Sequence, residues 1–320
     1  MLNQDISDIH LCATESLLHE SVIFPGPRKV DASELAYAED LLGRCKVLSG
    51  KKLDFMVFLG GEFFRGRQDN CAVDGVWYRL RRMPPTPPTL DSLPSSITSA
   101  VKKMLMSPLL QSGGLIYIVG APGQGKTTTA SGLLISRLRS FGGFAYTMED
   151  PPEMPLNGWH QAGYCSQTWV AGDANADWAE AFRGALRSQP AGTPTILYVG
   201  EVRDQDSALA ILRAASSGFL VVATGFGTDI VSSIDELVRR AGGGDESVLM
   251  SLASVVRLVL HQRLVDDRLI VQFLASANSR TTVAAKIRSG SLNQLISEIQ
   301  FQSNQALLGV DVLNDQMKGG

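Results

Sequence analysis

The sequence predicts an α/β protein in which a small α+β domain precedes a larger domain built on a parallel sheet. Three observations support this fold class. After residue 114, short Val/Ile/Leu runs bounded by glycine alternate with helix-like segments, which is typical of a parallel sheet covered on both faces. Before residue 83, apolar runs are separated by glycine and Asp/Asn turns, as in hairpins. A proline-rich stretch divides the two patterns.

Composition places the chain among globular proteins. Of its 320 residues, 44% are hydrophobic and 19% are charged, which suits one large or two smaller domains with a substantial core. The formal net charge is −3, so no domain-wide basic excess favours a nucleic-acid groove. We therefore expect no nucleic-acid partner.

The cysteines and the N-terminus favour a cytoplasmic protein. Cys12, Cys45, Cys71 and Cys165 are far apart and include no C-x-x-C pair, so they favour reduced thiols over a zinc site or a disulfide framework. The first residues lack the basic start and apolar core of a signal peptide. No apolar run approaches the roughly 20 residues that span a bilayer. We expect any membrane contact to be peripheral.

Residues 1–82 are expected to form the small mixed domain. Asp31–Leu42 has the pattern of a capped amphipathic helix. The expected strands are Leu53–Leu59, Gly61–Arg65 and Val76–Arg81. Residues 83–96 are rich in proline, which removes backbone donors and holds a chain extended. We expect them to form a stiff linker.

Residues 97–320 are expected to form the larger domain with its parallel sheet. The strands that we expect are Leu115–Val119, Phe144–Met148, Thr195–Val199 and Phe219–Thr224, and the helices between them are Thr127–Ser140, Trp178–Arg187 and Asp206–Ser216. Asp245–Ile299 is expected to be mostly helical, with a short hairpin at Gln262–Phe273 that turns at Asp266 and Asp267.

A phosphate-binding motif follows the first expected strand of this domain. Gly120–Thr127 matches G-x-x-x-x-G-K-[ST] and has the strand before it and the helix after it that the motif requires. Glycines allow the backbone N–H groups to face phosphates, and the helix adds its positive N-terminal end. Lys126 is expected to reach the β- and γ-phosphates, and Thr127 to supply a hydroxyl to Mg²⁺. The expected ATP-binding residues of this segment are Gly120, Ala121, Pro122, Gly123, Gln124, Gly125, Lys126, Thr127 and Thr128.

Polar side chains follow the next strands of the predicted sheet. Glu149 comes after the second strand, Glu201 after the third, and Thr224 ends the fourth. Because parallel strands end at one edge of a sheet, these side chains are expected near the phosphates. We expect Glu201 to orient the attacking water, Glu149 to support the metal or the water, and Thr224 to sense the γ-phosphate. A helix cap is the alternative for either glutamate.

Metal and charge neutralisation complete the predicted site. The expected Mg²⁺ ligands are Thr127, Glu149 and Glu201, some of them through water, and Arg203 is assigned a catalytic role. The four histidines form no cluster, so no other metal site is expected. Arginines that could contact nucleotide, in the same or in a neighbouring subunit, are Arg65, Arg67, Arg79, Arg81 and Arg82 on predicted strands, and Arg183 and Arg187 on a predicted helix. Solvated edge charges are the alternative for these side chains.

The chain resembles the PilT group of secretion ATPases, the motors that retract type IV pili. The resemblance runs over nearly the whole chain. It rests on Ser7–Leu11, Asp54–Phe58, Phe64–Arg67 and Tyr78–Pro84 in the first domain, on Glu149–Glu153, which resembles the family's Asp box, and on Glu180–Arg187 with Gly200–Asp204, which resemble its Walker B region.

This resemblance implies a PAS-like N-terminal domain, a RecA-like ATPase core and a homohexameric ring. It also implies a cytoplasmic location beneath an inner-membrane platform protein of a pilus or secretion machine. Glu201 would be the catalytic glutamate, and Arg65, Arg67 or Arg81 would contact nucleotide. ATP and Mg²⁺ are the implied cofactors.

Three segments depart from the family pattern. Phe219 and Phe226 stand where the family's His box has histidines. Gln189–Ala191 replaces the Asp-Pro-Asp before Walker B, and Ala284 replaces the first arginine of a C-terminal motif. These departures leave the nucleotide cradle intact, but they remove a possible γ-phosphate sensor.

The predicted function is an ATP-hydrolysing motor that retracts or disassembles a type IV pilus. An assembly-type ATPase is disfavoured because those relatives carry a four-cysteine zinc element. The alternatives are an ATPase of a conjugation or secretion apparatus and a weakly hydrolysing regulatory nucleotide-binding subunit. A helicase or DNA translocase would share the core, but the near-neutral charge counts against it.

Overall fold

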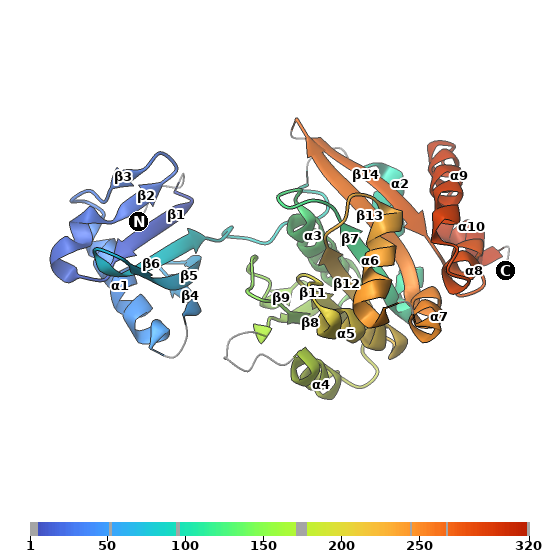
Figure 1. Ribbon diagram of the computed structural model, residues 1–320, viewed down its shortest axis with the longest axis horizontal. Coiled ribbons are helices and arrows are strands. Elements are labelled where there is room, and N and C mark those ends of the chain that lie inside the picture. Colours follow the sequence, from blue (N-terminus) through green and yellow to red (C-terminus); the bar gives the residue numbers. More distant parts are fainter. Residues whose placement is uncertain are drawn as a thin grey trace. The chain divides into compact units, whose positions relative to one another are not determined.

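The computed structural model describes residues 6–50, 53–93, 97–170, 178–243, 245–266 and 268–318. Residues 94–96 of the expected linker and Asp267 of the expected turn lie outside this part of the chain. The chain divides into an N-terminal unit, which contains residues 1–87 with 150–155 and 169–176, and a C-terminal unit, which contains the rest (Figure 1). The domain bounds expected from the sequence stay a prediction.

The N-terminal unit is a six-stranded antiparallel sheet with one long helix. The strand order is β3-β2-β1-β6-β5-β4, and each neighbouring pair is antiparallel. The strands are β1 (Asp8–Cys12), β2 (Val22–Phe24), β3 (Arg28–Lys29), β4 (Asp54–Leu59), β5 (Glu62–Cys71) and β6 (Gly75–Arg82), and a 3₁₀ helix, η1 (Glu15–Glu20), follows β1.

The helix of this unit, α1 (Leu35–Ser49), begins four residues later and ends seven residues later than the prediction. Asp31 does act as a cap, but of the turn that precedes the helix: its Oδ1 accepts from Ser33 N at 2.8 Å. The helix continues past Leu42 because Cys45 is also buried against the sheet. Apolar burial therefore extends the helix further than its sequence pattern indicated.

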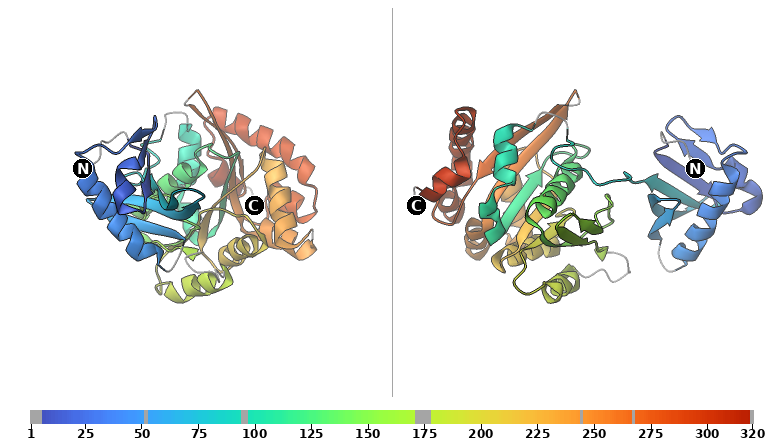
Figure 2. Two further views of the ribbon diagram at one scale, coloured as in Figure 1. Left: turned by 60° about the vertical axis from the view of Figure 1, so that its left-hand side comes forward. Right: turned by 180° about the vertical axis from the view of Figure 1, so that it is seen from behind.

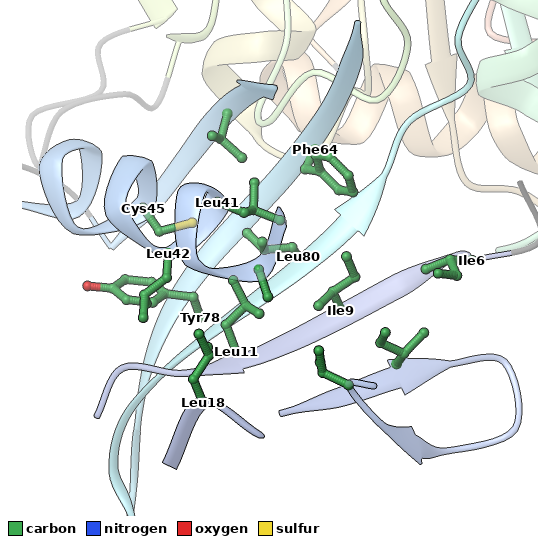
Figure 3. Close-up of a cluster of buried hydrophobic side chains, with 14 of the residues drawn as sticks. Ile6, Ile9, Leu11, Leu18, Leu41, Leu42, Cys45, Phe64, Tyr78 and Leu80 are labelled. Carbon is green, nitrogen blue, oxygen red and sulfur yellow. The ribbon is translucent and has the colours of Figure 1, made fainter. Parts of the chain in front are cut away.

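The core of the N-terminal unit lies between α1 and one face of the sheet. Figure 3 shows Leu41, Leu42 and Cys45 of α1 beside Tyr78 and Leu80 of β6. Burial raises the pKa of the Cys45 thiol to about 12, so this side chain behaves as a small apolar group. Alternation along each strand places the charged residues on the opposite face.

The C-terminal unit is built on an eight-stranded sheet with the order β14-β13-β7-β12-β11-β8-β10-β9. The strands are β7 (Gly114–Val119), β8 (Gly143–Met148), β9 (Gly158–His160), β10 (Gly163–Ser166), β11 (Thr195–Val199), β12 (Leu220–Gly225), β13 (Val256–Val265) and β14 (Arg268–Ala275). β7, β11 and β12 are buried along their whole length, as the continuous apolar runs predicted.

The prediction of a parallel sheet is confirmed for the centre of this sheet and needs correction at its edges. Strands from β13 to β10 pair in parallel. The edge strands β14 and β9 are antiparallel to their neighbours. The sheet is thus mixed and mostly parallel, because each edge is closed by a hairpin whose short turn allows only antiparallel pairing.

The expected hairpin is longer than predicted and belongs to the main sheet. It starts at Val256 instead of Gln262 and ends at Ala275 instead of Phe273. The first half of β13 follows directly on α7 (Glu246–Val255) and is equally apolar, so periodicity alone could not separate helix from strand. Pairing with β7 decides the outcome, since it buries Val256, Leu258 and Leu260.

Helices flank the sheet and form the C-terminal end of the chain. Their bounds are α2 (Ser99–Leu105), α3 (Lys126–Phe141), α4 (Trp178–Ser188), α5 (Gln205–Ser216), α6 (Ile230–Gly242), α8 (Thr282–Arg288), α9 (Leu295–Leu307) and α10 (Val312–Lys318), with 3₁₀ helices η2 (Pro108–Ser112) and η4 (Leu292–Gln294). Figure 2 shows α9 beside the β13–β14 hairpin. Among the described helices, none is long and apolar enough to cross a membrane.

Two leucines of the expected linker are buried in the C-terminal unit. Leu90 and Leu93 are in the core, and Leu90 N donates to Ser136 Oγ on α3 at 2.9 Å. The segment thereby packs against the helix that follows the phosphate loop.

Candidate functional site

The loop between β7 and α3 has the backbone shape of a phosphate cradle. Gly123 and Gly125 have φ angles of 74° and 75°, which favour glycine over any residue with a side chain. Gly125 is also the N-cap of α3 and offers no side-chain cap. The amide groups of the first helical turn therefore have no side-chain acceptor from the N-cap, and an anion is their natural partner.

Lys126 is the buried cation of this loop, and its side chain is 7% exposed. Its Nζ donates to the Ala121 carbonyl oxygen at 2.9 Å. The same ammonium group lies 4.7 Å from the centre of the Phe226 ring. The Lys126 side chain thus lies over the phosphate loop, and the Phe226 ring contacts it directly.

The turn that carries Glu201 is held by the end of the neighbouring strand. β11 and β12 pair in parallel. Thr224 of β12 is 1% exposed, and its hydroxyl donates to the Gly200 carbonyl oxygen at 2.5 Å. Val202 N donates back to the Thr224 carbonyl oxygen at 2.9 Å. Thr224 therefore positions Glu201, whereas its expected role as a γ-phosphate sensor stays a prediction.

Charged groups surround Glu201. Arg203 Nε donates to Glu201 Oε2 in a short ion pair. Arg240 of α6 donates through Nη1 to the Val202 carbonyl oxygen at 2.6 Å and through Nε to Glu236 Oε1 at 2.9 Å. Burial raises the pKa of the Tyr117 phenol, and the Glu201 and Glu236 carboxylates raise it further. A carboxylate between these groups can accept a hydrogen bond from water.

Glu149 is a fully enclosed carboxylate at the end of β8, with 2% of its surface exposed. Its Oε1 accepts a hydrogen bond from Gln167 Nε2 at 2.9 Å. Gly200 N donates to the Met148 carbonyl oxygen at 3.0 Å. A Cβ at Gly200 would lie 3.3 Å from Glu149 Cγ, so the segments that carry Glu149 and Glu201 lie against each other.

The donor set fits Mg²⁺ that is bound jointly with phosphate. Within the described residues, no group of three His, Cys, Asp or Glu side chains could hold a metal ion without other ligands. Thr127 is in the first turn of α3. Mg²⁺ commonly keeps several waters and takes few protein ligands beside substrate phosphates. A hydroxyl with one or two nearby carboxylates suits that chemistry.

The predicted arginine contacts lie on the polar face of the N-terminal sheet. Arg65 of β5 pairs in register with Arg81 of β6. Arg67 Nη1 lies 2.7 Å from Asp54 Oδ2, and Arg81 Nε lies 2.9 Å from Asp8 Oδ1. Arg67 and Arg81 thus have carboxylate partners within their own unit. The contact of Arg65, Arg67 and Arg81 with nucleotide stays a prediction.

Sequence reasoning missed three side chains that support the site: Gln167, Arg240 and Gln262. Gln262 of β13 donates through Nε2 to the Gln124 carbonyl oxygen of the phosphate loop at 2.6 Å. A polar residue in an apolar strand was the available signal for Gln262. Gln167 and Arg240 carried no such signal, since each acts through a contact that only the tertiary fold creates.

Comparisons with known proteins agree with this geometry. The model of the family described as type II/IV secretion system protein matches residues 71–304. Type II secretion system protein HxcR of Pseudomonas aeruginosa is 37% identical over 155 residues, which cover 48% of this chain and 30% of HxcR. Uncharacterized protein YggR of Escherichia coli is 26% identical over 321 residues, which cover 93% of this chain and 90% of YggR.

A solved structure shares the fold of the chain. The crystal structure of the pilus retraction motor PilT with bound ADP has a TM-score of 0.71 at 24% identity, and the match covers 92% of this chain and 86% of that one. The chain spans less than a third of HxcR but nearly all of YggR.

Proposed function

The chain belongs to the family of type II/IV secretion system proteins, and from this membership and its phosphate loop we propose that it is an ATP-hydrolysing motor subunit. The observation that carries the proposal is the phosphate cradle itself. Its glycines have left-handed backbone angles, its lysine is buried, and a helix begins beside that lysine without a side-chain cap. This arrangement binds a polyphosphate in preference to other ligands.

Different residues of the site would bind the phosphates, orient the attacking water and position the catalytic glutamate. Lys126 would exchange the Ala121 carbonyl for phosphate oxygens, and the α3 amides would bind the phosphates from the other side. Glu201 would accept a hydrogen bond from the attacking water and orient it. ATP, when bound with Mg²⁺, supplies the transferable phosphoryl group. Thr224 and Arg240 hold the Glu201 turn during this step.

The finer proposal is retraction or disassembly of a type IV pilus by a homohexamer in the cytoplasm. Its support is the set of motifs shared with the PilT group, together with a fold that PilT also has. In this proposal a RecA-like core and a PAS-like N-terminal domain shift against each other, and an inner-membrane platform protein is the partner. An ATPase of a conjugation or secretion apparatus is the alternative, because it would use the same loop.

A weakly hydrolysing regulatory subunit is the second candidate, and one observation favours it. Glu201 is engaged by Arg203, and Phe226 contacts Lys126 where the family has a histidine. Both contacts would have to be exchanged for nucleotide and water during turnover.

Steady-state phosphate release by the purified chain with ATP and Mg²⁺ tests the proposal. We expect Glu201→Gln to lower kcat by about a hundredfold or more, because general-base assistance is worth about that much, while ATP affinity stays near wild type. Glu39→Gln, an exposed change on α1 in the N-terminal unit, is the matched control and should keep full activity. A wild-type rate no higher than that of Glu201→Gln would favour the regulatory subunit.

A further inference from the structure

The phosphate loop, which follows β7, lies beside the neighbouring strand β13. β13 continues past the residue at which β7 ends. β13 pairs in parallel with β7 as far as His261, which lies opposite Val119, the last residue of β7. β13 then continues to Val265. Because side chains alternate along a strand, Gln262 and Leu264 are on the same face. The two residues therefore flank the loop that starts at Gly120.

Two hydrogen bonds join this extension of β13 to a single residue of the loop. Gln262 Nε2 donates to the Gln124 carbonyl oxygen at 2.6 Å. Leu264 N donates to Gln124 Oε1, also at 2.6 Å. Gln124 occupies a variable position of the phosphate-binding motif, so the motif does not require its side chain to contact phosphate. Its side chain and its backbone are both used for the contact with β13.

Close packing adds to these bonds. A Cβ at Gly120 would lie 2.5 Å from the Gln262 carbonyl oxygen, and a Cβ at Gly125 would lie 3.5 Å from Leu264 Cδ1. The first and last glycines of the loop thus lie against the same short segment of β13. Between these two glycines, the hydrogen bonds of Gln124 fix the middle of the loop to β13.

The Gln262 side chain is oriented by the donor contact alone. It is 0% exposed, and its Oε1 is buried without a hydrogen-bond partner among the described residues. Rotating the amide by half a turn would place Oε1 against the Gln124 carbonyl oxygen, where two acceptors repel each other. A buried acceptor without a partner costs free energy. The contact of Gln262 Nε2 with the loop is therefore kept at the expense of an unpartnered Oε1.

We propose that Gln262 is a positioning residue that preorganises the phosphate loop for nucleotide, with Gln124 as its partner. This inference rests on the proposed function, since it assigns a role within the same site. The loop contains left-handed glycines that are conformationally permissive, and the protein itself supplies the contacts that restrain them. Restraint before binding lowers the ordering cost of the complex, so it strengthens affinity rather than the chemical step.

The test compares the binding of ADP and ATP, each with Mg²⁺, to full-length variants by calorimetry, together with kcat, KM and Tm. Gln262→Leu should raise the Kd of both nucleotides and the KM about tenfold and change kcat less than about threefold, because the α- and β-phosphates lie in the loop in both complexes. Gln124→Ala should raise Kd in the same direction. The Kd of the double variant should rise by less than the product of the two single-variant increases, since both changes release the same loop.

Gln302→Leu is the matched control. Gln302 of α9 is also buried, and it binds both the N–H and the C=O of Ala275 at 2.7 and 2.9 Å, at the far end of the hairpin from the loop. This variant should lower Tm and leave Kd at the wild-type value. It separates the loss of a buried glutamine from the loss of the contact with the loop.

Each outcome decides the proposal. Folded Gln262→Leu with wild-type Kd would overturn it and leave the proposed function standing, provided that the wild-type chain binds nucleotide. If Gln262→Leu does not fold, Gln124→Ala decides, because that side chain is only partly buried; an unchanged Kd would overturn the proposal. A wild-type chain that binds neither ADP nor ATP would overturn the proposed function and this inference together.

Discussion

At the scale of single residues, the Lys126 side chain of the phosphate loop contacts the aromatic ring of Phe226. The Lys126 ammonium group lies over the Phe226 ring and on the Ala121 carbonyl. Phosphate oxygens would compete with both partners for the same charge. A cation–π contact is worth about 0.5–1 kcal/mol where water has access, so the competition is modest in size.

Replacing this ring should therefore change affinity in a defined direction. We expect Phe226→Leu to tighten ATP binding by about two- to fivefold, which corresponds to the loss of a cation–π contact of that size. Phe226→Tyr keeps an aromatic face and should bind like wild type. Calorimetric titration with ATP and Mg²⁺ measures both variants. Weaker binding by Phe226→Leu would mean that the ring supports the nucleotide instead of competing with it.

Replacement by alanine is expected to have opposite effects on stability at two glycines of the N-terminal unit. A Cβ at Gly66 of β5 would lie 2.5 Å from Phe55 Cε2 and 2.7 Å from Leu80 Cδ2, whereas a Cβ at Gly43 of α1 would meet nothing within 4 Å. Gly66→Ala should destabilise the unit by about 1–3 kcal/mol through overpacking. Gly43→Ala should stabilise it by roughly 0.5–1 kcal/mol, because alanine favours helix interiors.

Urea unfolding of the two variants and the wild type checks this pair. The unfolding midpoint should shift down for Gly66→Ala and up for Gly43→Ala. An unchanged or higher midpoint for Gly66→Ala would show that the close contacts at Gly66 relax without cost.

Glu149 and Glu201 were expected near each other at one edge of the sheet, and the hydrogen bond from Gly200 N to the Met148 carbonyl oxygen is consistent with that placement. Their roles in catalysis stay predictions. Gln167 could not be found in advance, because its partner Glu149 is 18 residues away in the chain. Gln262 was marked only as a polar residue in an apolar strand, and its partner Gln124 is 138 residues away. Such contacts leave no mark in local periodicity.

At the scale of elements, α1 is anchored at its start by an ion pair from a neighbouring strand. Arg28 of β3 donates through Nη1 and Nη2 to the two carboxylate oxygens of Glu34, both at 2.7 Å. Glu34 is the N-cap residue of α1 and is buried. The Arg28 guanidinium lowers the pKa of the Glu34 carboxyl below its ordinary value. The pair thus links the edge strand to the helix.

This linkage predicts how stability depends on pH. A carboxyl with a lower pKa in the folded chain adds stability above its unfolded pKa of 4.5, and that stability is lost as the pH falls through the folded pKa. Arg28→Met should therefore lower the free energy of unfolding at pH 7, and lower it by less at pH 3, which is below the unfolded pKa of the Glu34 carboxyl.

Urea unfolding at both pH values measures the difference. Lys29→Met is the control, because its partner Glu20 is exposed and such surface pairs contribute little. An effect of Arg28→Met that is equal at pH 7 and pH 3 would exclude the Glu34 ionisation as its cause.

Elements were predicted best where the apolar run was short and bounded by glycine. β11 matches its predicted bounds at both ends, β7 and β8 each begin one residue earlier than predicted, and β12 is shifted by one residue at both ends. The β13–β14 hairpin was predicted too short, because the apolar residues of α7 and β13 form one run without a break. Only pairing with β7 turns the second half of that run into a strand.

At the scale of the whole molecule, the order of strands explains how separate segments converge on one site. β12 lies between β7 and β11, so Thr224 ends between the phosphate loop and the Glu201 turn. β13 lies on the other side of β7 and reaches the loop from there. Sequence patterns predicted parallel strands but not this order, since strand order depends on contacts between distant segments.

The mixed edges of the sheet have the same origin. β9 and β14 are short or amphipathic strands whose partners are their immediate neighbours in the chain. Local hairpin formation therefore overrides the parallel pattern of the centre. The sequence predicted parallel pairing only for the central strands of the C-terminal unit. These strands are buried on both faces, and such burial leaves a continuous apolar run in the sequence.

The central claim is that the loop from Gly120 to Thr127 holds the phosphates of ATP through Lys126. The most direct measurement is the Kd of ATP with Mg²⁺ for Lys126→Ala, beside Lys102→Ala, a surface change on α2, as control. We predict that Lys126→Ala weakens ATP binding by about a hundredfold, because charge-assisted bonds to phosphate contribute about 1.5–3 kcal/mol, and abolishes turnover. Wild-type affinity and turnover in Lys126→Ala would contradict the account.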